Sequence, residues 1–581
     1  MKLGTNARFM HSAHSTQLQR AIVEDTSTIQ RWELFHLADR NGLTPPGIVG
    51  LKAYKVMPSG DTSSNEAFEW AMRRLQACNQ SHKCYRLDSL FKPSRVVDVS
   101  FFKESQDVVL IDGSSMRDSR YAALSHCWGS FIPPCKTTQA TLLDRKTRIS
   151  WALLPRTFQD AVTFIRRLHI QYLWIDTLCI VQDDVNDWLA ESGKMHSLYA
   201  NSYLTIAATS SRDSRGGLFA TARQPVRVAT VLAGESRHDI FARPLLNHIF
   251  SGTYLETNEE ELPLLTRAWA FQERLLAPRI LFFTQSELAW ECQETWDCEC
   301  KSLGGSKSAS SGTKHFRGLA AQTRLAIKTG IWHLTVTHYS NLGITKDTDR
   351  LPAFAGVAQE MMKYLPGQKY LAGLWSGSLQ ENLMWYTFSS TSSQFDRPQR
   401  IESWVPPTWS WASIPTEVFF NTAGKDATAV FEVIDASCQL ASNSLFGPVN
   451  GGRLVLLAKL LTQTMVNFVD DSWPIIKYDR FKFRFYPDIS TETVAQSQNS
   501  EKNLFDFHLL AGAITVRTAV NPPSPKPSDP QPRVEFCCLV IVQTQPNIFQ
   551  RSGFARFCVE DLDIVQEVFG LFGEYQEVTI I

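Results

Sequence analysis

The feature that most constrains the fold is an alternation of apolar and amphipathic segments between residues 121 and 209. Three apolar segments predict strands, at residues 121–128, 172–181 and 203–209. Two amphipathic segments between them predict helices, at residues 157–169 and about 186–202. Strands separated by helices in this way are typical of a parallel sheet that is covered on both faces. We therefore expect an α/β core.

Further signals extend this core on both sides. Thr157 and Asp160 have the spacing of a capping box at the start of the first predicted helix. An amphipathic helix is predicted from residue 66, and residues 267–292 predict a helix stopped near Pro278 and then two strands. We expect the α/β core to span about residues 118–295 within a domain of residues 66–300.

The remaining chain divides by composition. Residues 1–65 form a polar extension with one helix-like stretch around residues 28–40. Residues 301–395 predict a helical extension that opens with a flexible Ser/Gly/Lys-rich loop at 301–314. Residues 396–581 contain short β-like runs broken by a Pro-rich stretch at 521–532, which predicts a β-rich accessory domain.

Composition excludes several classes of partner. The chain has 58 Lys plus Arg and 58 Asp plus Glu, so no net field attracts nucleic acid or an anionic membrane. No apolar run reaches the length of a membrane span, and the N-terminus lacks the apolar core of a signal peptide. We expect a cytoplasmic protein whose twelve cysteines are reduced.

Two groups of cysteine and histidine residues raise the question of a zinc site. Cys78, His82 and Cys84 form C-x-x-x-H-x-C, and a second group contains Cys292, Cys298 and Cys300. Neither group has the paired C-x-x-C spacing of common zinc sites, so we expect packed or surface thiols and no metal. His126 and Cys127 are neighbours on a predicted strand, which places them on opposite faces and excludes a catalytic dyad.

One carboxylate stands out, that of Glu191. On a helical projection it shares the apolar stripe of Trp188, Met195 and Leu198, which faces the sheet. A carboxylate there must be paired, hydrogen-bonded, protonated or placed beside a ligand cavity. A structural salt bridge to a neighbouring arginine and a catalytic role both remain open. Asp183, Asp184 and Asp187 at the entrance to the same helix are explained by capping.

Six motifs together resemble the heterokaryon incompatibility (HET) domain of filamentous fungi. They appear in that family's order: YAALSHCWG, LPRTFQDAV, YLWIDTLCIVQDD, Glu191-x-x-x-Met195, LYANSYLTIAA and RAWAFQERLLAPRILFF. The sequence departs from the family where His126 replaces a common Tyr and Ala268 a common Gly, and the resemblance covers roughly residues 70–415. It implies an effector of fungal nonself recognition that triggers cell death. No P-loop or repeat is present, so sensing is expected from the flanks or from a protein partner.

A more remote resemblance is to Toll/interleukin receptor (TIR) domains, whose flavodoxin-like enzymes cleave NAD with a W-C-x-x-E motif. Trp188-x-x-Glu191 is similar to that motif, with Leu189 in place of the Cys. The resemblance implies a TIR-like parallel sheet, Glu191 as the catalytic residue and NAD as a substrate rather than a resident cofactor. It also implies a pocket formed by Ser125, Trp128, Gly129, Asp176 and Trp188.

Two functions follow from these resemblances. The first is an NAD glycohydrolase whose activity kills the cell, and the second is a noncatalytic adaptor that signals by self-association. Glu273 in FQERLL is a reserve catalytic candidate. The alternative for Glu273 and Arg274 is an ion pair that holds the last elements on the sheet.

Overall fold

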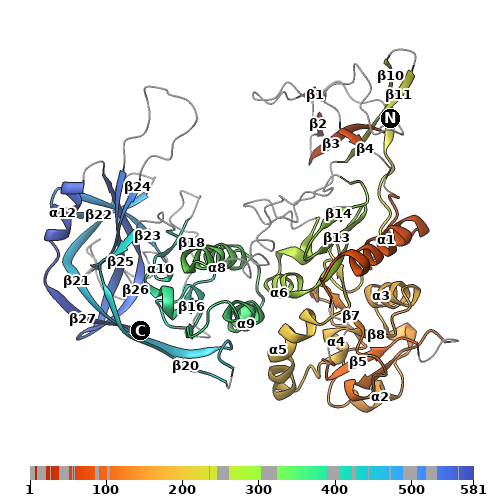
Figure 1. The fold of residues 1–581 in the computed structure, drawn as a ribbon, viewed down its shortest axis with the longest axis horizontal. Helices are drawn as coiled ribbons and strands as arrows, with labels where there is room; N and C mark the ends of the chain where they lie inside the picture. Colours follow the sequence, from red (N-terminus) through yellow and green to blue (C-terminus); the bar gives the residue numbers. More distant parts are fainter. Residues whose placement is uncertain are drawn as a thin grey trace. The chain divides into compact units, whose positions relative to one another are not determined.

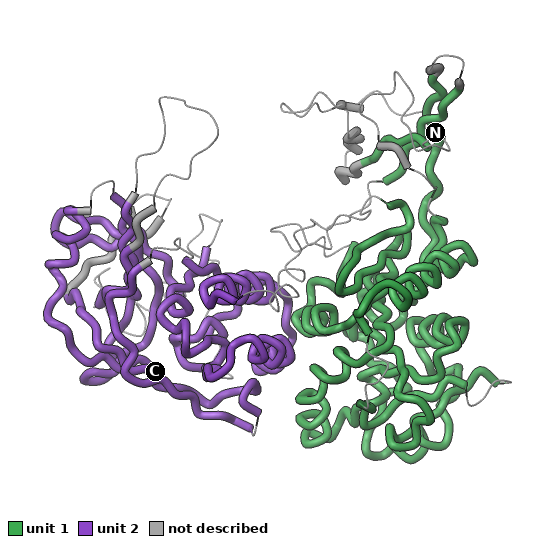
Figure 2. Tube along the Cα trace, in the orientation of Figure 1, with its two compact units in different colours: residues 1–314 green, residues 315–581 purple. Residues whose placement is uncertain are grey.

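The computed structural model divides the chain into two compact units, Met1–Lys314 and His315–Ile581 (Figure 2). The described residues are 7–9, 21–25, 28–37, 52–54, 57, 59–85, 91–100, 105–233, 236–244, 261–301, 323–388, 406–421, 427–442, 444–469, 473–488, 507–517, 533–559 and 562–581. The predicted loop at 301–314, apart from Lys301, and the Pro-rich stretch at 521–532 lie outside these residues.

The first unit is built on an eight-stranded mixed sheet in the order β14-β13-β12-β9-β7-β8-β5-β6 (Figure 1). Its strands are β5 Arg95–Asp98, β6 Val109–Asp112, β7 Tyr121–Ser125, β8 Tyr172–Trp174, β9 Leu204–Ala208, β12 Arg279–Phe283, β13 Leu288–Cys292 and β14 Trp296–Cys298. The central strands β12, β9, β7 and β8 are parallel, whereas β13 and β5 pair antiparallel at either side. The predicted α/β class is confirmed.

Helices cover both faces of this sheet. They are α1 Asn65–Ser81, α2 Leu142–Thr147, α3 Arg156–Arg167, α5 Val185–Ala200 and α6 Ala268–Leu276. On one face α3 packs Phe164 against Phe283 of β12, and Phe68 of α1 packs on the same ring of Phe164. On the other face, the Tyr121 hydroxyl of β7 donates to the carbonyl of Leu198 in α5. Since alternate strand residues share a face, Ser125 points to the α5 side as Tyr121 does.

Two strands are shorter than predicted. β7 ends at Ser125, so residues 126–128 lie in the loop beyond the strand. β8 ends at Trp174, and the short helix α4 Asp176–Cys179 replaces the second half of the predicted strand. The Asp176 carboxylate accepts the backbone N–H of Thr177 at 2.6 Å, a local bond that competes with a strand ladder. Periodicity alone does not separate a short buried helix from a buried strand.

The predicted capping box of α3 is wrong. The N-cap is Pro155, without a side-chain cap, and Thr157 lies inside the helix. The Thr157 hydroxyl accepts the N–H of Gly217, and the Asp160 carboxylate accepts the N–H groups of Leu218 and Phe219. Both side chains therefore hold the loop after β9 against the helix. The Thr157 hydroxyl and the Asp160 carboxylate thus bind backbone N–H groups of a distant loop and not the N-terminus of their own helix.

A second sheet in this unit contains β1 Ala7–Phe9, β2 Ala21–Asp25, β3 Thr28–Leu37, β4 Lys52–Tyr54, β10 Val226–Ala233 and β11 Ser236–Pro244. The helix expected around residues 28–40 is thus a strand over residues 28–37. Glu33 and Phe35, two residues apart, are both buried, and Phe35 stacks on Phe241 of β11. Antiparallel pairing with β11 establishes the strand.

The second unit combines helices with a nine-stranded sheet. Its helices are α8 Leu325–Ser340, α9 Ala355–Met362, α10 Leu379–Asn382 and α12 Leu562–Gly570. Short strand pairs are β15 Tyr370–Leu371 with β16 Leu374–Trp375 and β17 Trp385–Thr387 with β18 Val418–Phe420. The large sheet contains β19 Ala427–Ala429, β20 Glu432–Leu440, β21 Val449–Val469, β22 Trp473–Tyr478, β23 Phe481–Pro487, β24 Phe507–Arg517, β25 Arg533–Gln545, β26 Ile548–Val559 and β27 Tyr575–Ile580.

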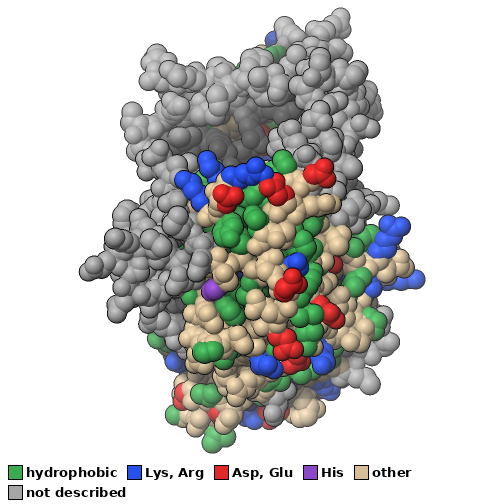
Figure 3. Space-filling view, turned by 90° about the vertical axis from the view of Figure 1, so that its left-hand side faces the viewer, with side chains coloured by type: hydrophobic (Ala, Val, Ile, Leu, Met, Phe, Trp, Pro, Cys, Tyr) green, Lys and Arg blue, Asp and Glu red, His purple; other side chains and the backbone are tan. Residues whose placement is uncertain are grey.

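Surface charge and helix length agree with the composition. On the face drawn in Figure 3, side chains of both charge signs lie among hydrophobic ones. Among the described helices, none is both long and apolar enough to cross a bilayer. All twelve cysteines lie in described residues, and none of them forms a disulfide.

Candidate functional site

A buried carboxyl meets a serine hydroxyl at the end of the central strand β7. Ser125, the last residue of β7, donates its hydroxyl hydrogen to Oε2 of Glu273 on α6. Glu273 is 8% exposed, and burial raises the pKa of its carboxyl to about 7, with Asp176 adding to the rise. The hydrogen bond from Ser125 acts in the opposite direction. A carboxyl with such a pKa can donate or accept a proton at neutral pH.

Two more polar groups converge on Asp176, which follows β8. The Trp128 indole N–H donates to Asp176 Oδ2 at 2.7 Å. Nδ1 of His126 lies 3.7 Å from Oδ1 of the same carboxylate. Burial lowers the pKa of His126 below its ordinary range, although Asp176 pulls it upward, so the imidazole is neutral at pH 7. Of the predicted pocket residues, Trp128 and Asp176 are therefore in direct contact.

These groups lie where a parallel sheet binds ligands. Ser125 ends β7, which lies between β8 and β9. The chain therefore moves from β7 to the strand on one side, β8, and then across to the strand on the other side, β9. The crevice beyond the carboxyl ends of strands at such a reversal is the usual ligand position in open α/β sheets. Ser125, Asp176 and Glu273 thus form a candidate acid–base site, called here the β7 site.

Glu191 is buried as predicted, but its contacts lie beside β5. It is 4% exposed on α5, and its Oε1 accepts a hydrogen bond from Lys194 Nζ at 3.1 Å. Lys194 also donates to Ser94, and Arg95 of β5 lies within electrostatic reach of Glu191. Among the described residues, Lys194 is the one hydrogen-bonding partner of the Glu191 side chain. The structure joins Glu191 to this ionic cluster and joins Ser125 to Glu273 instead.

The two other predicted pocket residues have structural partners. Trp188 of α5 packs edge-on against Trp269 of α6 at 6.3 Å between ring centroids. Gly129 has a positive φ of 61°, and a Cβ there would lie 2.6 Å from the Cβ of Asp213. Gly129 therefore allows the loop after β7 to turn tightly against the 212–213 backbone.

Glu273 and Arg274 have separate partners and do not pair with each other. Arg274 Nε pairs with Oε2 of Glu291 in β13 at 2.9 Å, and both side chains are buried. That pair holds α6 on the antiparallel edge of the sheet, while Glu273 points to Ser125. Adjacent opposite charges on a helix favour an ion pair, which is why the sequence alone makes Glu273 only a reserve candidate. The pairing of Arg274 with a later strand could not be read from local spacing.

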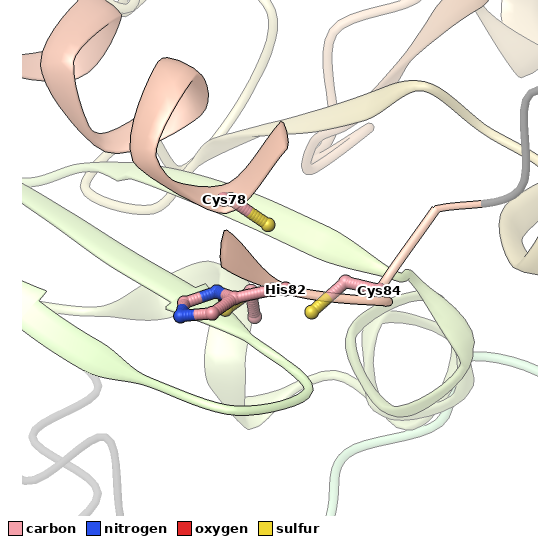
Figure 4. Close-up of side chains that lie close together, drawn as sticks. Cys78, His82 and Cys84 are labelled. Carbon is pink, nitrogen blue, oxygen red and sulfur yellow. The ribbon is translucent and has the colours of Figure 1, made fainter. Parts of the chain in front are cut away.

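Two cysteine groups converge in space despite their unusual spacing. Ligand atoms of Cys78, His82, Cys84 and Cys292 all lie within 4.8 Å of one another, as do those of Glu287, Cys298 and Cys300. Figure 4 shows the side chains of Cys78, His82 and Cys84 gathered at the end of α1 and the segment that follows it. The five thiols are buried, as expected, but the first group also has the number and type of ligands that a metal ion requires.

The raised pKa of Glu273 predicts a pH-dependent stability. Because the unfolded carboxyl ionises near pH 4.5 and the folded one near 7, the stabilisation is complete below pH 4.5 and is lost as pH rises through 7. The linked loss is about 3 kcal/mol. Glu273→Gln lacks this titrating group. As pH rises from about 5 to 8, the melting temperature of the wild type should therefore fall relative to that of the variant. A constant difference across this range would contradict the buried carboxyl.

Comparison with protein families gives one match. Residues 121–273 match the family model described as Heterokaryon incompatibility protein (HET). The matched segment begins at β7 and ends at Glu273, so it contains every polar residue of the β7 site and also Glu191. The resemblance predicted from the motifs is confirmed over this segment. Searches of curated proteins and of solved structures found no match.

Proposed function

We propose that the HET domain at residues 121–273 makes this chain an effector of fungal nonself recognition whose activity leads to cell death. The observation that carries the proposal is the position of the β7 site, whose members all belong to the matched segment. A death effector needs an output, either a chemical reaction or an assembly. The β7 site supports the first, because it combines two carboxyl groups in different environments with a hydroxyl group.

We further propose that this output is cleavage of NAD. The parallel strands follow the order β8-β7-β9-β12, which is 2-1-3-4 in chain order and matches the flavodoxin-like arrangement. This order supports the TIR-like resemblance inferred from the motifs. A flavodoxin-like sheet binds nucleotide cofactors at the carboxyl ends of its first and third strands, and Ser125 ends the first.

The chemistry assigns a role to each group. In hydrolysis the electron pair of the bond between the ribose C1′ and the pyridinium nitrogen leaves with neutral nicotinamide. Carboxylates of Glu273 and Asp176 would stabilise the cationic sugar as this bond breaks. Water then adds to C1′, and ionised Glu273 accepts its proton, which is the role of a general base with a pKa near 7. The TIR-like motif implies Glu191 in this role instead, so the two acids are competing candidates.

The test compares the two buried acids. The purified full chain is incubated with NAD at concentrations that favour assembly, and nicotinamide release is followed for wild type, Glu273→Gln and Glu191→Gln. We expect Glu273→Gln to lower the rate at least about 100-fold. Glu191→Gln should retain most of the activity if its contacts with Lys194 are structural.

The opposite ranking of the two variants would assign catalysis to Glu191. A folded wild-type chain that releases no nicotinamide would refute NAD cleavage. Circular dichroism and melting temperature of each variant show that a lost rate is not a lost fold.

An adaptor that acts by self-association is the second candidate. Val185 and Leu189 lie one turn apart on α5 and are 73% and 40% exposed, so two apolar side chains face outward on the same side of this helix. Exposed apolar groups of this kind suit a protein contact. If the adaptor proposal is correct, toxicity survives Glu273→Gln and is lost with self-association in a Val185→Lys, Leu189→Lys double variant.

A further inference from the structure

Four side chains from two distant segments meet at the edge of the first unit. Cys78 lies in the last turns of α1, and His82 and Cys84 follow that helix. Cys292 is the last residue of β13, and His82 Nδ1 lies 3.4 Å from its sulfur although the two residues are 210 positions apart. We propose that Cys78, His82, Cys84 and Cys292 bind a zinc ion in a closed, structural site.

The geometry fits a tetrahedral ion. Zinc binds thiolates at about 2.3 Å and imidazole nitrogens at about 2.0–2.1 Å, which places tetrahedral ligand atoms roughly 3.3–3.8 Å apart. The four ligand atoms lie within 4.8 Å of one another, and the nitrogen-to-sulfur distance of 3.4 Å falls in that range. Three cysteines with one histidine are a common ligand set of structural zinc sites, in which no position is left for substrate.

A buried cation beside the group is an independent indication. Arg279 of β12 is the register partner of Cys292 and is 1% exposed. Its Nη1 donates to Asn79 Oδ1 and its Nε has no acceptor, and no described Asp or Glu forms an ion pair with it. An isolated buried charge costs several kcal/mol, so it requires a nearby negative partner.

The zinc–thiolate centre would supply that negative charge, because its ligands bind as thiolates. Three thiolates and a neutral imidazole around Zn²⁺ carry a net charge of −1, which balances the guanidinium of Arg279. Three neutral thiols and an imidazole carry no charge and leave Arg279 uncompensated. The guanidinium lies over the rings of Tyr85 and Tyr203, at 5.1 and 4.9 Å from their centroids, but these neutral rings supply no counter-charge.

The turn after β13 provides donors for a thiolate. The backbone N–H of Thr295 donates to the Cys292 sulfur at 3.3 Å, and the Thr295 hydroxyl lies at the same distance. N–H and O–H groups aimed at a ligand atom are the usual second shell of a metal site, because they stabilise the anionic form of the ligand. A packed, neutral thiol does not require two such donors.

The site would join segments that flank the matched HET domain. Cys78, His82 and Cys84 precede residue 121, and Cys292 follows residue 273, so one ion connects α1 to strand β13. Such an ion stabilises the folded state because the unfolded chain cannot gather the four ligands. This inference is independent of NAD cleavage. It predicts that the HET domain needs both flanks to fold.

Zinc content of the full chain tests the site. The protein is purified without chelators, and metal is measured for wild type, His82→Ala, Cys84→Ser and Cys558→Ser. We expect one zinc per chain in the wild type, loss of at least nine tenths of it in the first two variants, and full retention in Cys558→Ser. Cys558 is an exposed thiol and controls for the loss of any cysteine.

Two further measurements keep the test decisive. Cobalt added to the metal-free wild type should produce the charge-transfer and d–d bands of a tetrahedral thiolate site, which requires no variant to fold. Cys298→Ser should retain zinc, since Glu287, Cys298 and Cys300 offer three ligands rather than four. A wild type without zinc or cobalt bands would overturn the proposal, as would zinc lost from Cys298→Ser and kept by His82→Ala.

Discussion

Replacing Asp488 by Ala is expected to lower the free energy of unfolding of the second unit by about 3–5 kcal/mol. Asp488 and Arg551 of β26 are both 0% exposed at their side chains and are joined by a 2.9 Å contact between Oδ2 and Nε. Arg551 also donates to the carbonyl of Leu383 at 2.6 Å and stacks on Trp385 at 3.4 Å. Removal of the carboxylate leaves a buried guanidinium without a counter-charge.

Hydrogen exchange of the full chain measures this effect separately from the first unit. Peptides from β17 and β26 should lose protection in Asp488→Ala, while peptides from β7 and α5 keep it. Asp435→Ala is the matched control, because Asp435 pairs with Arg453 at 3.9 Å on the surface and both side chains are more than half exposed. That surface pair should be worth at most about 1 kcal/mol. Equal effects of the two replacements would contradict the account of the buried pair.

A third variant separates charge from packing at this site. When Arg551→Met is combined with Asp488→Leu, both charges are removed and replaced by apolar side chains. Hydrophobic replacement of a whole buried ion pair is often neutral or stabilising. We therefore expect the double variant to be more stable than Asp488→Ala. A double variant as unstable as the single one would show that hydrogen bonds of Arg551, and not its charge, hold the unit together.

Periodicity in the sequence predicted the central elements well because their burial follows from the local chain. Segments 157–169 and 186–202 are apolar at helical spacing, and α3 and α5 formed within two residues of the expected bounds. The apolar run at 172–181 carries no such period. Its division into β8 and α4 depends on hydrogen bonds made by Asp176, which burial patterns do not register.

The site was harder to predict because it depends on strand order. Glu191 and Glu273 are both acids in apolar helical stripes, and the sequence offered no physical reason to rank them beyond a motif. In the structure α5 brings Glu191 to Arg95 of β5, whereas α6 brings Glu273 to Ser125 of β7. Which strand lies under each helix is a property of the whole sheet. The choice between Glu191 and Glu273 therefore depends on the three-dimensional order of the strands.

The metal ligands show the same limit. Spacing rules compare residues within one segment, and C-x-x-x-H-x-C lacks the pairing that such rules recognise. The fourth ligand comes from β13, which lies beside α1 only after the sheet has formed. The sequence does place Cys292 at the end of a predicted strand. The three residues that it meets in space could not be identified from one sequence.

Replacing Gly129 by Ala is expected to destabilise the first unit and to impair the β7 site. Gly129 has φ of +61°, which costs a residue with a Cβ about 1–2 kcal/mol. The added Cβ would also lie 2.7 Å from the carbonyl oxygen of Arg212 and 2.6 Å from the Cβ of Asp213, neither of which is the end of a flexible side chain. Overpacking of this kind adds about 1–3 kcal/mol. The total loss is about 2–5 kcal/mol.

The same substitution reports on function because Trp128 precedes Gly129. A displaced loop moves the indole N–H that donates to Asp176, so Gly129→Ala should lower both the melting temperature and any nicotinamide release. Gly193→Ala is the matched control, since nothing lies within 4 Å of a Cβ at this helical position. There alanine should stabilise α5 by up to ~1 kcal/mol and leave the rate unchanged. If Gly129→Ala behaved like Gly193→Ala, the tight turn after β7 would not be required to position Trp128 for its hydrogen bond to Asp176.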